Sequence, residues 1–450
     1  MRTFSLKHKL IKISSIALPS GANSLLDMAN VTVGMYFVSE FSKEHMIALN
    51  VGMNYIMMLF AITAIFFIGT SAQVARFYGA REYQKLQQAM GNNFLIALFS
   101  SIPLLVLAYV CSESYLDWMG RGVSGEAKHL GLEYLGIVVF GIPALMTKTI
   151  CVAGLSALGD TKRVMYIKLI TTTFNVVLNY VLIFGFDFGI FTIDSLGVFG
   201  AGLCNMCITY LEALLLFGAM YLRKNVLRFA FVLRLEYSKN MFNIGVPAGI
   251  ERFLTLFSLV LTQKFMSEYG ADIIAGFQIG SKVEAFILTF GFGFQVAAMA
   301  LVGQSLGKKR MDLAYDFLKT LLVFSSVIMG ILGLVICVWG IELSKIFNTE
   351  EAVLRASLYY IIAVGLSQVP LVMIFCLDGA LRGVGATKLS LMINATSIWV
   401  LRIVPMYLCV AYQSDVRIVF GIIFIETYLR AFVFGAVFKS KIWEKFIKRF

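Results

Sequence analysis

The stretch IALPSGANSLLDMANVTVG (residues 16–34) returns 228 positions later as IGVPAGIERFLTLFSLVLT (244–262), with Pro19 and Pro247 at equivalent places. Gly79 and Gly307 are related by the same spacing. Further along the chain the spacing becomes 226, so that GDTK (159–162) is equivalent to GATK (385–388). A long internal duplication in an apolar chain is typical of a secondary transporter built from two structural repeats.

The composition places the whole chain in a membrane. Of the 450 residues, 59% are hydrophobic and 14% are charged, whereas a soluble domain has about 25% charged residues. Apolar runs of about 20 residues, each long enough to cross a bilayer as a helix, follow one another along the chain. We therefore expect an all-α integral membrane protein with twelve transmembrane helices in two pseudo-symmetric six-helix bundles. The predicted spans are roughly 13–38, 46–75, 90–111, 129–155, 162–186, 196–222, 241–267, 272–304, 316–341, 356–381, 388–411 and 416–438.

Most basic residues lie in the segments at one face of the predicted bundle, so the net charge of +12 reports membrane topology. The positive-inside rule then places both termini in the cytoplasm of a multi-pass protein of the bacterial inner (plasma) membrane. Arg2, Arg223 and Lys224 are among the basic residues of that face, and Arg121 is one of the few on the opposite face. The predicted parts are an amino-terminal bundle (1–222), a cytoplasmic linker (223–240), a carboxy-terminal bundle (241–438) and a basic amphipathic cytoplasmic tail (439–450).

A polar stripe runs along the first predicted span of each half. Its members recur in steps of four, three and four residues, which places them on one helical face. The stripes are Asn23, Asp27, Asn30 and Gly34 in the first half, and Glu251, Thr255, Ser258 and Thr262 in the second. A polar stripe cannot face lipid cheaply, so we expect the two stripes to line a central cavity. The alternative is hydrogen bonding between packed helices.

Carboxylates inside the spans are the candidate ion-coupling residues, because a charge in a span is costly and marks function. They are Glu251, Glu284, Asp27 and Asp378. We expect Glu251 and Glu284 to share a proton, with a fixed salt bridge as the alternative for Glu284. Protons are favoured over sodium as the coupling ion, since burial favours the protonated form of a carboxylate and sodium needs several convergent oxygens. Asp27 has no basic residue within reach on its own helix, so it is expected to line the cavity.

Polar side chains at matching depths are the candidate substrate-binding residues. They are Asn23, Asn30, Asn50, Asn54, Asn175, Asn179, Thr255, Ser258, Gln278 and Lys282. Lys282 and Glu284 are two residues apart and cannot face each other, so each needs its own partner. For Asn175 and Asn179 the alternative is contact between packed helices. The spacing of Glu426 and Arg430 predicts a local ion pair.

Other function classes find no support in the sequence. The chain has no G-x-x-x-x-G-K-[ST] loop, which argues against ATP hydrolysis. Cys204 and Cys207 form a C-x-x-C inside an apolar span, where packing is the expected role. The three histidines, His8, His45 and His129, lie outside the bilayer core, so no metal site is expected. We expect a non-enzymatic monomer that needs no cofactor, binds small-molecule substrates and the lipid bilayer, and does not bind nucleic acid.

The sequence resembles the multidrug and toxic compound extrusion (MATE) family over nearly its whole length. GFGFQVA (291–297) followed by MALVGQSLG (299–307) resembles the most recognisable signature of that family, and TSAQVARFYGA (70–80) is its counterpart in the first half. Further similar motifs are SALGDTK (156–162), GALRGVGATK (379–388), KVEAF (282–286) and NVVLNYVLIFG (175–185). The resemblance implies two six-helix bundles in a V around a central cavity. It also implies export of organic, usually cationic, compounds in exchange for protons or sodium.

Three positions depart from the family pattern. Gly34 stands where one branch carries an ion-binding aspartate late in the first helix, so that site is not carried over. Glu251 lies about one turn earlier than the glutamate of a second branch, and Asp378 lies closer to Arg382 than that branch places its aspartate. Glu251 and Asp378 are nevertheless the residues that the resemblance implies for ion coupling.

Two other functions remain open at this point. The first is a lipid-linked oligosaccharide flippase of the same wider superfamily, because Lys148, Arg252, Lys282 and Arg402 suit a pyrophosphate head group. The second is a membrane receptor or assembly factor that transports nothing. The duplicated polar stripes argue against the second, because a scaffold needs no polar cavity.

Overall fold

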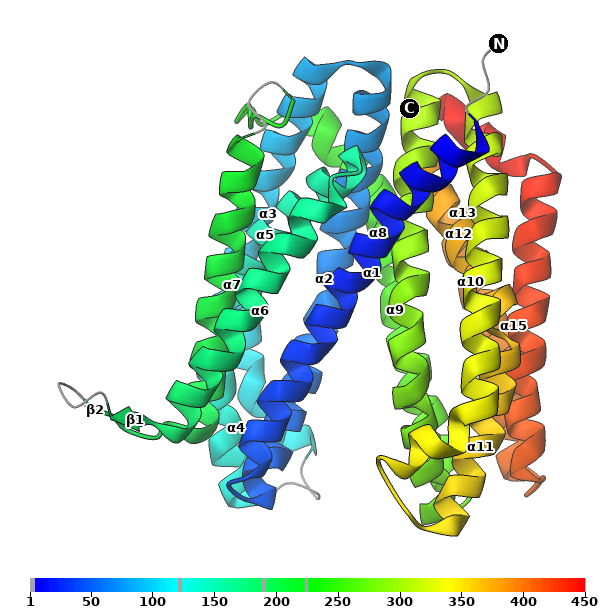
Figure 1. The fold of residues 1–450 in the computed structure, drawn as a ribbon. Coiled ribbons are helices and arrows are strands. Elements are labelled where there is room, and N and C mark those ends of the chain that lie inside the picture. The colour runs from blue at the N-terminus through cyan, green and yellow to red at the C-terminus, as the bar shows by residue number, and fades with distance from the viewer. Residues whose placement is uncertain (1–4, 120–123, 188–191, 223–225, 450) are drawn as a thin grey trace. The chain divides into compact units, whose positions relative to one another are not determined.

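The structure is a computed structural model that describes residues 5–119, 124–187, 192–222 and 226–449 (Figure 1). Arg2, Arg121, Arg223 and Lys224, which contribute to the charge argument, lie outside the described residues. Fifteen α-helices are described: α1 (Leu6–Ser39), α2 (Lys43–Ala80), α3 (Tyr83–Met119), α4 (Gly125–Val138), α5 (Ile142–Leu158), α6 (Thr161–Phe184), α7 (Gly197–Tyr221), α8 (Leu235–Ser267), α9 (Ala271–Gly307), α10 (Met311–Lys345), α11 (Glu351–Leu366), α12 (Gln368–Val384), α13 (Thr387–Thr396), α14 (Val404–Ala411) and α15 (Val416–Lys439).

Short elements complete the chain. The 3₁₀ turn η2 (Val139–Gly141) joins α4 to α5, and the π-helical segment η3 (Ser397–Ile403) joins α13 to α14. The 3₁₀ helix η4 (Ile442–Arg449) follows α15. Two-residue strands β1 (Phe186–Asp187) and β2 (Thr192–Ile193) pair antiparallel between α6 and α7.

The predicted spans coincide with helical segments, except that 162–186 runs two residues past the end of α6 and 196–222 one residue past each end of α7, and the all-α membrane fold is confirmed. Ten helical segments in the described part of the chain are long and apolar enough to cross a membrane. The pair α11 and α12, bent by 52° at the break between them, would make an eleventh span. Helix α1, with 34 residues, covers the first predicted span.

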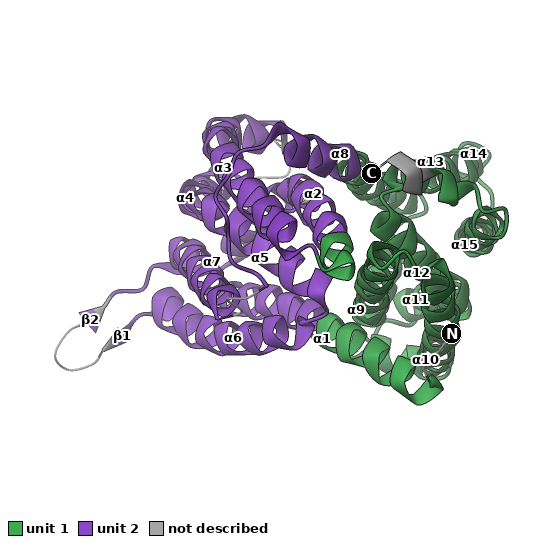
Figure 2. Cartoon of the chain, turned by 90° about the horizontal axis from the view of Figure 1, so that it is seen from above, with its two compact units in different colours: residues 1–22, 75–81, 246–450 green, residues 23–74, 82–245 purple. Residues whose placement is uncertain are grey.

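Two compact units divide the helices, and each takes part of a helix from the opposite half of the sequence (Figure 2). Unit 1 contains residues 1–22, 75–81 and 246–450, and unit 2 contains residues 23–74 and 82–245. Thus the first half of α1 belongs to unit 1, and the start of α8 belongs to unit 2. The predicted bundles 1–222 and 241–438 are continuous in the sequence, whereas each unit includes a helix segment from the other half. The bundle boundaries at residues 222 and 241 therefore stay a prediction.

The same pair of repeat positions is in close contact at both exchanges, with the glycine on α9 in unit 1 and on α8 in unit 2. In unit 1, a Cβ atom on Gly293 would overlap the carbonyl oxygen of Ala17. In unit 2, a Cβ atom on Gly245 would overlap the carbonyl oxygen of Ile65. Residues 17 and 245 are related by the repeat spacing of 228, and so are residues 65 and 293. The duplication seen in the sequence therefore reappears as the same close backbone contact in each unit.

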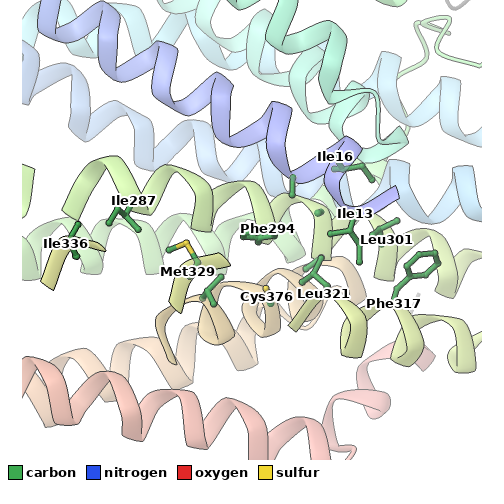
Figure 3. Packing of buried hydrophobic residues seen from close by; sticks show 14 of the residues in the cluster. Ile13, Ile16, Ile287, Phe294, Leu301, Phe317, Leu321, Met329, Ile336 and Cys376 are labelled. Carbon is green, nitrogen blue, oxygen red and sulfur yellow. The ribbon is translucent and has the colours of Figure 1, made fainter. Parts of the chain in front are cut away.

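The exchanged half of α1 is held by apolar packing and by one ion pair. Ile13 and Ile16 are buried in a cluster with Phe294 and Leu301 of α9 and residues of α10 and α12 (Figure 3). At the start of α1, Lys9 Nζ lies 2.7 Å from Asp316 Oδ1 of α10. Burial of this apolar face fixes the first half of α1 within unit 1.

Polar contacts help to fix the start of α8 in unit 2. The Gln73 side chain donates to the Tyr237 carbonyl at 2.8 Å, and Asn92 donates to Ser238 Oγ at 3.0 Å. Before the helix, the Arg234 backbone N–H donates to Asn92 Oδ1 at 2.8 Å. The described part of the linker, residues 226–240, is thereby tied to the helices of unit 2.

The duplicated GDTK and GATK segments form the same helix end. Gly159 after α5 and Gly385 after α12 have φ values of 83° and 86°, in the left-handed region that favours glycine. In both copies the next residue donates its N–H to a carbonyl five residues earlier, from Asp160 to Leu155 and from Ala386 to Leu381. Each glycine therefore stops one helix and directs the chain into the next.

The carboxy-terminal tail packs on unit 1. Trp443 of η4 is buried against Tyr315 of α10 and Phe438 of α15, and Tyr315 Oη donates to Glu444 Oε1 at 2.9 Å. The basic and amphipathic character predicted for 439–450 is visible in Lys439, Lys441 and Lys445 beside this buried tryptophan. The tail is thus anchored to unit 1 by Trp443.

A first prediction concerns the glycines at the ends of α2 and α9. A Cβ atom on Gly307 would overlap the Arg76 carbonyl oxygen, and one on its repeat equivalent Gly79 would overlap the Gln304 carbonyl oxygen. Because backbone must move to admit a methyl group, we expect Gly307→Ala to lower the free energy of unfolding by about 1–3 kcal/mol. Gly435→Ala on α15 is the control, since nothing lies within 4 Å of its Cβ position. Thermal unfolding in detergent measures both, and equal midpoints would contradict the proposed close contact.

Candidate functional site

The main polar cluster of unit 1, here called the Glu251 cluster, is built by four helices. Helix α8 supplies Glu251, α9 supplies Gln295, and α12 supplies Asp378 and Arg382 one turn apart. Helix α13 supplies Ser390 and Asn394, also one turn apart. Both carboxylates are buried, with exposed fractions of 7% for Glu251 and 2% for Asp378.

Nitrogen donors occupy one oxygen of each carboxylate. Glu251 Oε1 accepts from Arg382 Nη2 and from Asn394 Nδ2, each at 2.8 Å. Asp378 Oδ2 lies 2.6 Å from Arg382 Nε and accepts from Gln295 Nε2 at 2.5 Å. Arg382 therefore joins the two carboxylates through its two ends, which fixes their separation.

The other oxygen of each carboxylate faces the same serine hydroxyl. Ser390 Oγ lies 3.0 Å from Glu251 Oε2 and in hydrogen-bond contact with Asp378 Oδ1. A serine hydroxyl has one hydrogen, so it can donate to only one of the two carboxylates. The second contact is a hydrogen bond only if that carboxylate is protonated and donates to Ser390 Oγ. The geometry thus suits one proton shared by Glu251 and Asp378.

Glu284 lies in a different environment, and the expectation that it shares a proton with Glu251 is not met. Its Oε2 atom accepts from Tyr360 Oη of α11 at 2.6 Å. Lys282 is exposed, and its ammonium lies 5.6 Å from the centre of the Phe347 ring. The partner of Glu251 is instead Asp378, because α12 and not α9 brings the second carboxylate to α8.

Asp27 has a basic partner that its own helix could not reveal. Its Oδ1 atom lies 2.5 Å from Lys168 Nζ of α6. Within unit 2 the same lysine also lies 3.1 Å from Glu212 Oε2 of α7. Residues on three different helices meet here, so tertiary packing alone determines this pairing.

The remaining candidates in unit 2 are distributed along α1, α2 and α6. Asn23 Nδ2 lies 3.5 Å from Asp27 Oδ2. Asn50 donates to the Met46 carbonyl of its own helix at 3.0 Å, and Asn54 is exposed. Asn179 is buried and donates to Asn175 Oδ1 at 3.0 Å. The amides of α6 therefore bond to each other.

In unit 1, the polar stripe of α8 is largely satisfied by its own helix. Thr255 Oγ1 donates to the Glu251 carbonyl at 2.8 Å, and Ser258 Oγ donates to the Thr255 carbonyl at 2.7 Å. Gln278 of α9 is exposed. Of this stripe, Glu251 is the member that reaches other helices.

Several residues of the Glu251 cluster were not predicted from the sequence. Ser390, Asn394 and Gln295 were not predicted, and Arg382 entered only through its closeness to Asp378 in the sequence. Ser390, Asn394 and Ser397 step by four and three residues, which is the same kind of polar stripe that identified α1 and α8. A search for stripes in every span would have found this face. Among the described residues, no group of three or more His, Cys, Asp or Glu could hold a metal ion.

A duplicated helical bundle with buried carboxylates defines the class of a multi-pass membrane transporter. The MatE family profile matches residues 19–181 and 247–408, which is one copy in each half. The chain belongs to the MatE family.

Relatives agree with this assignment over nearly the full length. A protein of Thermotoga maritima called "Probable multidrug resistance protein NorM" is 24% identical over 90% of this chain and 86% of its own length. A protein of the same name from Neisseria meningitidis serogroup A is 25% identical over 92% of this chain and 90% of its own length.

Solved structures share the fold. A structure described as MATE in complex with MaL6 superposes with a TM-score of 0.88 at 17% identity, covering 97% of both chains. A MOP superfamily transporter from Pyrococcus furiosus superposes with a TM-score of 0.87 at 17% identity, covering 96% of this chain and 95% of the other.

Proposed function

We propose that this protein is a proton-coupled antiporter that exports organic compounds by alternating access. One observation supports Glu251 and Asp378 as the pair that binds and releases the proton. A single hydroxyl, Ser390 Oγ, lies between Glu251 Oε2 and Asp378 Oδ1. The full set of contacts needs one proton, and loss of that proton leaves two carboxylates at one hydroxyl. Such a pair can take up a proton on one side of the membrane and release it on the other.

Protons fit this site better than sodium because its oxygens already have donors. Arg382, Asn394 and Gln295 present N–H groups to the carboxylates. A sodium ion needs several free oxygen ligands, and N–H groups would face it instead. Glu284, hydrogen-bonded to Tyr360, remains a second candidate for ion coupling in unit 1.

The proposed substrates follow from the relatives and from the family resemblance. The relatives are named as probable multidrug resistance proteins, and the resemblance implies cationic organic compounds. The proposed location is the plasma membrane of a bacterium, with both termini in the cytoplasm, on the basis of the charge distribution. We propose a monomer that uses an ion gradient and no cofactor.

Transport by reconstituted protein tests the coupling ion. Proteoliposomes that contain the purified protein would be given either a pH gradient or a sodium gradient at clamped pH, with ethidium as the transported cation. We expect ethidium movement to follow the pH gradient and to be insensitive to sodium. Movement that follows sodium at clamped pH would contradict proton coupling, and ethidium movement equal to that in empty liposomes under both gradients would contradict export of organic cations.

A further inference from the structure

Four charged side chains of unit 2 have no part in the mechanism proposed for the Glu251 cluster. They are Asp27 of α1, Lys148 of α5, Lys168 of α6 and Glu212 of α7, and together they are called the four-charge cluster. Lys168 Nζ lies 2.5 Å from Asp27 Oδ1 and 3.1 Å from Glu212 Oε2. Lys148 Nζ lies 2.9 Å from the same Glu212 oxygen. The cluster is thus a chain of alternating charges across four helices.

The lysine and glutamate at the centre of the cluster are buried, whereas Asp27 is exposed to solvent. The side chains of Lys168 and Glu212 are 4% and 3% exposed, whereas that of Asp27 is 51% exposed. Two acids and two lysines sum to zero charge. An additional cation that entered at Asp27 would leave the buried part with an uncompensated positive charge, which is costly at this depth. Entry of a cation is therefore favourable only if a positive charge leaves.

Buried oxygens around Asp27 lack donors. Asn23 and Asn30 flank Asp27 by about one helical turn on α1, and the Oδ1 atom of each is buried without a hydrogen-bond partner in the described structure. Thr172 Oγ1, one turn after Lys168 on α6, is also buried without a hydrogen-bond partner among the described residues. Unsatisfied buried acceptors are costly, and a ligand with N–H groups would satisfy them. The carboxylate and its neighbouring oxygens therefore match an organic cation that carries N–H donors.

We infer that the four-charge cluster is a second exchange site, which binds an organic ammonium or amidinium ion at Asp27 and releases a proton from Lys168. The cation takes the place of the Lys168 ammonium at Asp27 Oδ1. One N–H bond of that ammonium breaks, the proton passes to water, and Lys168 remains as a neutral amine. Asp27 is then paired with the ligand and Glu212 with Lys148, so the total charge stays at zero. This inference rests on the proposed function, because the bound cation is the exported substrate.

Lys168 is the group that loses the proton because of its position between the acids. The charged groups that face it are Asp27 from α1 and Glu212 from α7, with Lys148 of α5 beyond Glu212. A ligand at Asp27 removes one of the two acids that hold the Lys168 charge. Lys148 keeps its acid partner, because that partner within the cluster is Glu212 and the ligand binds at Asp27.

Calorimetry on the purified full-length protein tests this exchange, with ethidium as the probe. Titrations in buffers of different ionisation enthalpy give the number of protons released for each cation bound. Lys168→Met leaves Asp27, Glu212 and Lys148 with a net negative charge and removes the internal competitor. We expect this variant to bind ethidium about tenfold more tightly, since Coulomb energies at such distances are several kcal/mol. It should also release about one proton fewer than the wild type.

Two further variants keep the test decisive. Asp27→Asn should weaken ethidium binding at least about tenfold, because the charge that holds the ligand is gone. The double variant Asp27→Asn with Lys168→Met keeps the charge balance and should lose both ethidium binding at this site and the associated proton release. If Lys168→Met does not fold, the double variant carries the test.

Two outcomes would overturn the inference: Lys168→Met with wild-type affinity and wild-type proton release, or wild-type binding by the double variant. The Glu251→Gln variant separates this inference from the proposed function. In that variant the proton released from Lys168 should persist while transport driven by a pH gradient is lost. Failure of the Glu251 proposal would instead appear as unchanged transport.

Discussion

Glu251→Gln should abolish transport driven by a pH gradient and leave the protein folded. The amide cannot ionise, so the pair with Asp378 can no longer cycle a proton through the Ser390 contact. We expect the transport rate to fall by about 100-fold or more, as when an essential acid–base group is removed. Folding should survive because Arg382 keeps Asp378 as its counter-charge at 2.6 Å. The measurement is ethidium movement in proteoliposomes with an imposed pH gradient, beside a thermal unfolding curve of the same preparation.

Glu284→Gln is the matched control for this result. Glu284 is also a membrane glutamate of unit 1, but it accepts its hydrogen bond from a single hydroxyl, Tyr360 Oη. It has no second carboxylate at that hydroxyl among the described contacts. We expect a smaller loss of transport in this variant than in Glu251→Gln. Normal transport by a folded Glu251→Gln protein would remove Glu251 from the mechanism and leave Glu284 and Asp27 as the acids to examine.

Much of the fold could be predicted because it depends on local and repeated signals. Apolar runs located the membrane helices, and the repeated segments GDTK and GATK fall at the same kind of helix end in both halves. The exchange of α1 and α8 segments between the units was not foreseen. It depends on which carbonyl lies opposite Gly293 and Gly245, and this is a tertiary relation that periodicity within one helix does not contain.

The candidate site was predicted residue by residue but not as pairs. Glu251, Asp378 and Asp27 were singled out because an acid inside a span is costly. Their partners came from other helices: Ser390 and Asn394 from α13 for Glu251, and Lys168 from α6 for Asp27. Spacing rules relate residues on one helix, as the confirmed pair of Glu426 and Arg430 shows. They do not state which helix faces which, and so Glu284 was paired with Glu251 in error.

The largest expected effect on stability is at Glu426 of α15. Its side chain is fully buried between two arginines: Arg402 Nη2 lies 2.5 Å from Oε2 and Arg430 Nε lies 3.2 Å from Oε1. Ser397 Oγ donates to Oε1 at 2.7 Å. Ser397 and Arg402 are the first and sixth residues of the π-helical segment η3, whose wider turn brings both to the same carboxylate.

Glu426→Gln would leave two buried guanidinium groups with no carboxylate between them. Breaking a buried ion pair costs about 3–5 kcal/mol, because the remaining charge is uncompensated. Glu351→Gln is the control: Glu351 also pairs with an arginine four residues later, at 2.6 Å from Arg355, but both side chains are exposed. An exposed pair contributes about 0–1 kcal/mol, so this variant should melt like the wild type. Adding Arg402→Gln to Glu426→Gln should recover part of the loss, because it removes one unpaired charge. If Glu426→Gln unfolds at the wild-type temperature, water or another group must compensate the arginines, and the buried triad would not hold α15 to η3.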